Sequence, residues 1–328
     1  MKNFIDNIHI TNFKSVRDCS IESCRRINLF IGRPNVGKTN IIEALSFFSI
    51  PFLKENSSKK LSNLIRLENE GELFYNGDTS LDATIRTNIG KCAIRYSPKE
   101  GLKAEVDFFG DSFNDIRIDE KLNVKGIHNH QHFEPPVKRY NFKTDVLFKK
   151  SHAKYLIPPY GYNLFSIIEN YPELKSEVRS LFREYGLDIV FEKGSQSMKI
   201  IQPGNNEFFI VPYNSTADTL QRVIFFKTAI VSNSDSVILF EEPEAHSFPP
   251  FMTHITQEMI YKKDNQFFLA THSPFILNDL IENAREELAV FIVHYENHET
   301  KLRKLSAEEL HDVFQNGIDL FTNSESFV

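Results

Sequence analysis

The stretch Gly32-Arg-Pro-Asn-Val-Gly37-Lys38-Thr39 follows an apolar run from Ile27 to Ile31. After it, apolar residues recur at helical spacing at Ile41, Ile42, Leu45 and Phe48. These patterns predict a buried strand, a glycine-rich loop and a helix from Lys38 to about Ser49 that Pro51 stops. Because glycines let the backbone N–H groups of such a loop turn toward phosphate oxygens, the stretch predicts a phosphate site at the N-terminus of the helix.

The side chains of this loop suit a nucleotide with a divalent cation. Lys38 can supply a positive charge to the β- and γ-phosphates, and the Thr39 hydroxyl can ligate Mg²⁺. The predicted cofactors are therefore ATP and Mg²⁺. The residues predicted to bind the nucleotide within and beside the loop are Gly32, Asn35, Val36, Gly37, Lys38, Thr39 and Asn40.

A second element joins an apolar strand to adjacent carboxylates, in Val237-Ile-Leu-Phe240-Glu241-Glu242-Pro243-Glu244. Ligands of α/β sheets sit at the carboxyl ends of the strands. There, one carboxylate can hold the metal ion or its water while the next orients and deprotonates the attacking water. The alternative is a strand that ends in a solvated acidic turn, which the upstream phosphate loop disfavours.

His272 ends another apolar strand, Phe267-Phe-Leu-Ala-Thr-His272-Ser-Pro. A histidine in that place can touch the γ-phosphate and report its presence. A lone histidine at a strand end is usually structural, but the order of the three elements along the chain favours a nucleotide role.

The remaining patterns predict the organisation of the chain. Residues 71–120 alternate in short segments between turns, which predicts an antiparallel sheet, and residues 121–136 are expected to be a loop or lid. Residues 164–182 have helical spacing. In the last third, short apolar strands alternate with helices, as in a parallel sheet covered on both faces, before a hairpin and a helix from Ala307. The expected class is α/β, with a nucleotide-binding domain at 1–50 and 211–328 and an insertion at 51–210 that carries the antiparallel sheet and a helical lever.

Composition places the 328-residue chain among soluble globular proteins, since 41% of its residues are hydrophobic and 25% are charged. No apolar run reaches the roughly 18 residues that span a bilayer, and no signal peptide is evident. We therefore expect a cytoplasmic protein without membrane contact. Three cysteines are too few for a disulfide framework.

One segment reverses the net charge of −6. Between Lys121 and Lys154, eight lysine and arginine residues face only Glu134 and Asp145. The segment is either a solvated loop face or a surface for a phosphate backbone or an acidic partner. Within it, His128, His130 and His132 alternate, which suits either a metal site or a solvated loop, and no cysteine or carboxylate nearby completes a metal set.

Four stretches together resemble a family. They are Ile8-His-Ile-Thr-Asn-Phe-Lys14-Ser15-Val, the P-loop (Gly32 to Thr39) with Asn40, Glu241-Glu-Pro-Glu-Ala-His246, and Ala270-Thr-His-Ser-Pro274. They are similar to the SMC/RecF/OLD group of ABC-type P-loop ATPases, including stand-alone ATPases found beside bacterial antiphage effectors. The resemblance implies an ABC-type sheet, a metal role for Glu241, a catalytic-base role for Glu242 and a switch role for His272. It also implies that Lys14 lies near the phosphates, where the alternative is a surface charge.

Two features depart from the family pattern. Glu241 stands where an aspartate is usual, which leaves direct metal ligation open. The signature segment, Asn214 to Arg222, lacks the glycines of the ABC signature. We expect Ser215 or Thr216 to cap the next helix, with Asp218 in its first turn, and one of the two hydroxyls to meet the γ-phosphate held by a second protomer. The expected assembly is a homodimer or a larger homo-oligomer with ATP sandwiched between copies.

The function expected from the resemblance is that of an ATP hydrolase, the sensor or regulatory subunit of a bacterial antiviral defence system. Its nuclease or toxin is expected to be a separate effector protein, because residues 290–328 leave no room for the Toprim nuclease of OLD proteins. The alternatives are a nucleotide-locked scaffold with little turnover and a RecF-like DNA-repair ATPase. Whether nucleic acid binds stays open at this point.

Overall fold

The computed structural model describes residues 3–127, 133–203 and 207–327. Its centre is a six-stranded sheet in the order β16-β15-β3-β14-β13-β9. Neighbouring strands pair in parallel except for the hairpin of β15 and β16. The strands are β3 (Ile27–Ile31), β9 (Val137–Tyr140), β13 (Val237–Glu241), β14 (Gln266–Ala270), β15 (Leu288–Glu296) and β16 (Glu299–Lys304).

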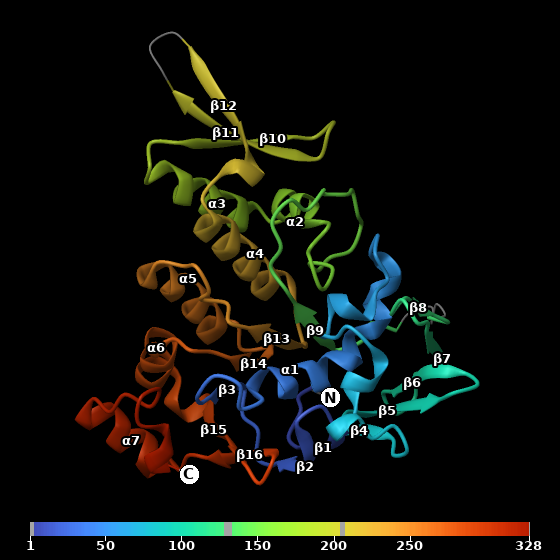
Figure 1. The fold of residues 1–328 in the computed structure, drawn as a ribbon. Helices are drawn as coiled ribbons and strands as arrows, with labels where there is room; N and C mark the ends of the chain where they lie inside the picture. The colour runs from blue at the N-terminus through green and yellow to red at the C-terminus, as the bar shows by residue number, and fades with distance from the viewer. Residues whose placement is uncertain (1–2, 128–132, 204–206, 328) are drawn as a thin grey trace.

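Each face of this sheet is covered by a different layer (Figure 1). Side chains of a strand alternate between faces, so Leu29 packs in one apolar core and Phe30 in the other. The Leu29 face is covered by α4 (Asp218–Ser232), α5 (Pro249–Tyr261) and α6 (Pro274–Ala284), with α7 (Ala307–Asn316) beside α6. The Phe30 face is covered by α1 (Lys38–Ser46) and a second sheet. The predicted parallel sheet with two covered faces is confirmed.

The second sheet is antiparallel and has the strand order β2-β1-β4-β5-β6-β7-β8. Its strands are β1 (Ile8–Phe13), β2 (Val16–Ile21), β4 (Ala83–Thr87), β5 (Gly90–Ser97), β6 (Gly101–Asp107), β7 (Ser112–Ile118) and β8 (Val124–Lys125). Most of the expected antiparallel sheet is present. The expected start of the sheet at about residue 71 is wrong, because its first strand in this range is β4. An Asn69–Glu72 capping box and the positive φ of Asn76 accompany the 3₁₀ turns Glu70–Leu73 and Tyr75–Gly77 there.

A third region lies at the end of the molecule opposite both chain termini (Figure 1). It contains α2 (Leu164–Asn170), α3 (Pro172–Arg183) and a three-stranded antiparallel sheet of β10 (Asp188–Glu192), β11 (Ser197–Pro203) and β12 (Phe208–Pro212). The division of the chain into 1–50 with 211–328 and an insertion at 51–210 stays a prediction. One strand inside that insertion range, β9, belongs to the six-stranded sheet.

Short 3₁₀ turns complete the structure. The α-helix that starts at Lys38 ends at Ser46, before the expected end at about Ser49. The expectation that Pro51 stops the helical segment is wrong, because a 3₁₀ segment, Phe47–Glu55, continues through Pro51. The other 3₁₀ turns are Leu61–Asn63, Tyr213–Ser215, Arg285–Glu287 and Ser324–Phe327. Among the helices of the described residues, none has the length and apolar character needed to cross a membrane.

Candidate active site

The P-loop joins the end of β3 to the start of α1, as the sequence predicts. Gly37 has a φ of 99°, in the left-handed region that favours glycine. A Cβ atom on Gly37 would lie 2.1 Å from the Thr300 Oγ1. That hydroxyl donates to the Val36 carbonyl oxygen at 2.9 Å, so β16 supports the loop from behind. The glycine is therefore required both by its backbone conformation and by the close approach of Thr300.

The Lys38 ammonium lies inside the turn of the loop. Its Nζ donates to the carbonyl oxygens of Gly32 at 2.9 Å and Arg33 at 2.7 Å. The side chain is buried, and burial lowers the pKa of Lys38 to about 8 although the nearby Glu242 acts to raise it. A phosphate that reaches this place would meet a cation that has given up much of its hydration.

Glu241 brings the end of β13 into contact with the first turn of α1. The Thr39 hydroxyl donates to Glu241 Oε1 at 2.7 Å, so the two residues predicted to hold Mg²⁺ are neighbours. Two arginines also contact this carboxylate: Arg139 Nη2 lies 2.6 Å from Oε2, and Arg66 Nη2 lies 2.8 Å from Oε1. Burial acts to raise the pKa of Glu241, but Arg139, Thr39 and Arg66 together lower it. The carboxylate is thus held in its ionised form.

Glu242 and His272 meet at the carboxyl ends of β13 and β14. Glu242 has a φ of 41°, and its N–H donates to the Ala270 carbonyl oxygen at 2.8 Å. The Glu242 Oε1 lies 3.7 Å from His272 Nε2, and both side chains are half-exposed. Burial and Lys38 lower the pKa of His272, while Glu242 acts in the opposite direction. The two predicted catalytic side chains therefore form a pair beside Lys38.

Glu244 positions the backbone of this histidine, a role that the sequence motif did not reveal. Its Oε1 accepts hydrogen bonds from the Thr271 hydroxyl and the His272 N–H, each at 2.7 Å. Burial raises the pKa of Glu244 despite these bonds. The third carboxylate of the motif thus fixes the loop that carries His272.

Lys14 lies beside the P-loop, and its predicted place near the phosphates stays a prediction. Its Nζ contacts the buried carboxylate of Glu43 and donates to the Arg66 carbonyl oxygen at 2.6 Å. Next to it, Asn40 Nδ2 donates to the Ser15 hydroxyl at 2.6 Å. The turn between β1 and β2 is therefore tied to α1.

A cavity of about 380 Å³ collects most of the predicted site. Its lining combines cations and hydroxyls suited to phosphate with the Glu242 and His272 pair. Eight of the predicted residues line it: Lys14, Asn35, Gly37, Lys38, Thr39, Asn40, Glu242 and His272. Glu241 lies behind Thr39, in contact with its hydroxyl.

Ser215 and Thr216 line a different, largely apolar cavity of about 430 Å³, beside Phe248 and Phe251. The prediction that one of them caps α4 is wrong. The N-cap is Ala217, without a side-chain hydrogen bond, because the Thr216 hydroxyl donates instead to the Tyr213 carbonyl oxygen at 2.7 Å. Asp218 does lie in the first turn. Within one chain, the signature segment does not line the P-loop cavity.

The basic segment is only partly a surface. Lys138 and Arg139 are buried because β9 pairs with β13 inside the sheet, so these two of the eight cations are not on a solvated face. Lys149 and Lys150 are exposed. His128, His130 and His132 lie outside the described residues. The sequence analysis did not identify Arg139 as a site residue. The available signal was the pair of adjacent cations, Lys138 and Arg139, between the apolar Val137 and Tyr140.

Comparisons with known proteins identify the family of this chain. A family model described as "AAA domain, putative AbiEii toxin, Type IV TA system" matches residues 27–278. The "DNA replication and repair protein RecF" of Clostridium botulinum is 33% identical over 126 residues, which cover 35% of this chain and 34% of that relative. The RecF protein of Flavobacterium johnsoniae is 22% identical over 273 residues, covering 79% of this chain and 68% of that relative. The match thus spans about a third of the clostridial relatives' length.

Solved structures show the same fold at low identity. The "SmcHead bound to the C-winged helix domain of ScpA" has a TM-score of 0.54 and 14% identity, over 93% of this chain and 99% of that chain. The "Smc head domain with an extended coiled coil" of Pyrococcus furiosus, bound to the C-terminal domain of ScpA, has a TM-score of 0.51 and 12% identity, over 95% and 99%. The fold is therefore the mixed α/β fold of SMC head ATPases.

Proposed function

The chain belongs to this family of AAA domains and is an SMC/RecF-type ABC P-loop ATPase, and from that premise we propose that it binds MgATP at the P-loop cavity and hydrolyses it. The observation that carries the proposal is the meeting of Lys38, Thr39, Glu242 and His272 in one cavity, with Glu241 in contact with Thr39. Water would attack the γ-phosphate in line with the leaving oxygen.

The residues present fit a magnesium ion. Thr39 Oγ1 and Glu241 Oε1 lie 2.7 Å apart at the mouth of the loop, and Mg²⁺ prefers such hard oxygen ligands together with phosphates and water. The bound ion would neutralise charge on the β- and γ-phosphate oxygens. Lys38 and the loop N–H groups bind the phosphates. Glu242 orients the attacking water and accepts a proton from it, and His272 senses the γ-phosphate.

A second copy of the chain completes the site in this proposal. Ser215 and Thr216 lie away from the P-loop cavity of their own chain, so a head-to-tail homodimer, or a larger homo-oligomer, would present them to the ATP of a partner. The N-terminus of α4 would add its dipole to that contact. ATP would then act as the bridge between protomers.

The test measures phosphate release and particle mass together. The purified chain is expected to release phosphate from ATP when Mg²⁺ is present, and light scattering is expected to record an ATP-dependent increase in mass. With EDTA, release should stop because charge on the phosphates is no longer neutralised. Failure to bind any nucleotide would remove the proposal.

A second candidate is a nucleotide-locked scaffold with little turnover. Two observations favour it: the signature segment has no glycine, and Glu241 is held by two arginines as well as by Thr39. Tight ATP-dependent association without measurable phosphate release in the wild-type chain would select this candidate over the hydrolase.

The biological setting is also proposed. The family description names a toxin and a toxin–antitoxin system, which supports a sensor or regulatory ATPase in bacterial antiviral defence acting with a separate nuclease or toxin in the cytoplasm. The RecF relatives support the alternative of a DNA-repair ATPase that binds nucleic acid. Co-purification with the product of a neighbouring gene, compared with binding to duplex DNA, separates the two settings.

A further inference from the structure

The edge strand β9 carries two neighbouring cations in the protein interior. Lys138 and Arg139 are each 1% exposed, and successive side chains of a strand point to opposite faces. Arg139 donates from Nη2 to Glu241 Oε2 at 2.6 Å. Its other two nitrogens, Nε and Nη1, have no hydrogen-bond partner among the described residues. The contact with Glu241 is thus the main polar contact of this guanidinium.

Such an arrangement is a poor way to stabilise a sheet. Taking a guanidinium out of water is unfavourable, and a buried ion pair often stabilises a fold less than apolar side chains of the same volume. Donors left without partners add to that penalty. Because burial of Arg139 carries this penalty, we look for its role in the site of its partner carboxylate, Glu241.

The two arginines on Glu241 differ in their freedom to move. Arg139 holds Oε2 and its side chain is 2% exposed, whereas Arg66 holds Oε1 and its side chain is 73% exposed. Oε1 is also the oxygen that accepts from Thr39. An exposed side chain is free to leave Oε1 to a metal ion, whereas the buried Arg139 has less freedom to leave Oε2.

We propose that Arg139 is a positioning residue that fixes Glu241 Oε2, so that Oε1 stays beside the Thr39 hydroxyl as a ligand for the metal of MgATP. The extra methylene of a glutamate lets one carboxylate reach Arg139 on β9 and Thr39 on α1 together. The contact between Arg139 and Glu241 would explain why position 241 holds a glutamate. This inference rests on the proposed function, since it concerns how the same site takes up its metal.

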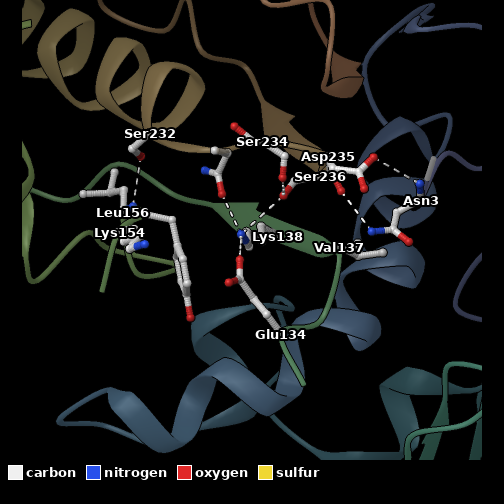
Figure 2. A network of polar contacts seen from close by, with 12 residues as sticks. Asn3, Glu134, Val137, Lys138, Lys154, Leu156, Ser232, Ser234, Asp235 and Ser236 are labelled. Carbon is white, nitrogen blue, oxygen red and sulfur yellow. Dashed lines mark hydrogen bonds and ion pairs between the residues drawn. The ribbon is translucent and has the colours of Figure 1, made fainter. Parts of the chain in front are cut away.

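Lys138 supplies a matched control (Figure 2). Its ammonium contacts Glu134, the Asn233 Oδ1 at 2.7 Å and the Ser236 Oγ at 3.3 Å. It also lies 4.0 Å from the centre of the Tyr155 ring. Among the described residues the polar contacts of Lys138 do not include Glu241, yet Lys138 shares the strand and the burial of Arg139. Replacing either cation with methionine therefore disturbs β9 alike, while only one replacement releases Glu241.

The experiment measures Mn²⁺ uptake by electron paramagnetic resonance in the presence of ATP, using Mn²⁺ as the probe for the magnesium site. Arg139→Met is expected to raise the Mn²⁺ concentration at half-saturation by about tenfold or more, the usual effect of losing a residue that orients a metal ligand. Lys138→Met is expected to leave it within about twofold. Binding of ATP in EDTA should be the same in all three proteins.

Glu241→Asp tests whether the length of the glutamate side chain is needed for the contact with Arg139. A shorter carboxylate loses the contact with Arg139, so adding Arg139→Met to Glu241→Asp should weaken Mn²⁺ uptake no further, a non-additive result. If Arg139→Met does not fold, Arg139→Lys keeps a cation with a shorter reach and should shift the half-saturation in the same direction by less.

The outcomes separate the inference from the function it rests on. Wild-type binding of Mn²⁺ and ATP with an unshifted Arg139→Met variant would overturn the positioning role and leave the ATPase proposal standing. Equal shifts in Arg139→Met and Lys138→Met would also overturn it, because the effect would then belong to the strand. A wild-type chain that takes up no metal with ATP would overturn both.

Discussion

The two segments proposed to meet the γ-phosphate are built in opposite ways. At the P-loop edge of the six-stranded sheet, polar side chains find partners within the chain: Thr39 and Arg139 on Glu241, and Lys14 on Glu43. At the signature segment, neighbouring side chains are apolar and exposed. Phe248, 63% exposed, lines the same cavity as Ser215 and Thr216, and on the preceding strand β12 Phe208 is 73%, Phe209 66% and Ile210 55% exposed.

The difference indicates which half of the site is complete in one chain. The charges around the P-loop need no second molecule to fix their positions, because the buried carboxylates of Glu241 and Glu43 already contact cations of the same chain. Exposed apolar surface next to Ser215 and Thr216 is of the kind that marks contact sites. We therefore expect substitutions at the P-loop edge to act on binding and chemistry, and substitutions at the signature segment to act only through association.

The largest effect is expected from Lys38→Ala. The phosphates lose the ammonium that the loop holds beside the Gly32 and Arg33 carbonyl oxygens, so ATP affinity should fall below detection. Isothermal titration calorimetry with ATP, and circular dichroism to verify folding, provide the measurement. Undiminished affinity in a folded variant would contradict the assignment of the P-loop.

The next largest effect is expected from Glu242→Gln. The amide keeps the shape of the side chain 3.7 Å from His272 but cannot accept a proton. Phosphate release should therefore fall by about 10² to 10⁴ while ATP still binds. Blocked hydrolysis should also accumulate the ATP-dependent dimer in light scattering. Glu241→Gln is the comparison, since it should raise the Mg²⁺ requirement instead. Turnover of Glu242→Gln at the wild-type rate would assign the proton acceptor elsewhere.

The contrast between the regions also separates what the sequence could and could not predict. The strand, loop and helix around Gly32 to Thr39 depend on local rules, glycine conformation and apolar spacing, and the structure has them in place. The carboxylates of Glu241 and Glu242 come at a strand end because the apolar run before them is fully buried. Local patterns of this kind are readable without tertiary information.

Pairing between distant segments was not readable. Arg139 and Glu241 are 102 positions apart, and only the pairing of β9 with β13 brings them together. The same pairing removes Lys138 from the basic surface that composition suggested. At the signature segment, the Thr216 hydroxyl satisfies the Tyr213 carbonyl oxygen of a 3₁₀ turn rather than the end of α4. A short polar side chain has several local acceptors, and packing decides among them.

An intermediate effect is expected from the double substitution Ser215→Ala and Thr216→Ala. Each chain should still bind ATP, because neither hydroxyl lines its own P-loop cavity, while phosphate release should fall by about tenfold through the loss of hydrogen bonds to a charged group. Thr253→Ala, at an exposed threonine of α5, is the control.

Mixing sharpens this test. When the purified double variant is mixed with the purified Lys38→Ala variant, part of the phosphate release should return. A mixed dimer has one site in which an intact P-loop faces an intact signature segment. Neither variant can recover if each chain works alone. Absence of recovery, with mixed dimers demonstrated by mass, would mean that the two segments do not share an ATP.

The smallest effect is expected from reversing charge at Lys149 and Lys150. Lys149 donates to the Ser57 hydroxyl at 2.9 Å and lies 5.7 Å from the centre of the Tyr162 ring. Both lysines are exposed, so their charge is available to an acidic partner. Lys149→Glu with Lys150→Glu should weaken duplex DNA binding several-fold and reduce its salt dependence by about two counterions, with ATP affinity unchanged.

Lys262→Glu with Lys263→Glu gives the same net charge outside this segment and controls for long-range repulsion. Equal behaviour of the two double variants, or DNA binding that ignores both salt and charge reversal, would mean that the segment is a solvated face and that the functional charge of the chain is confined to the P-loop edge.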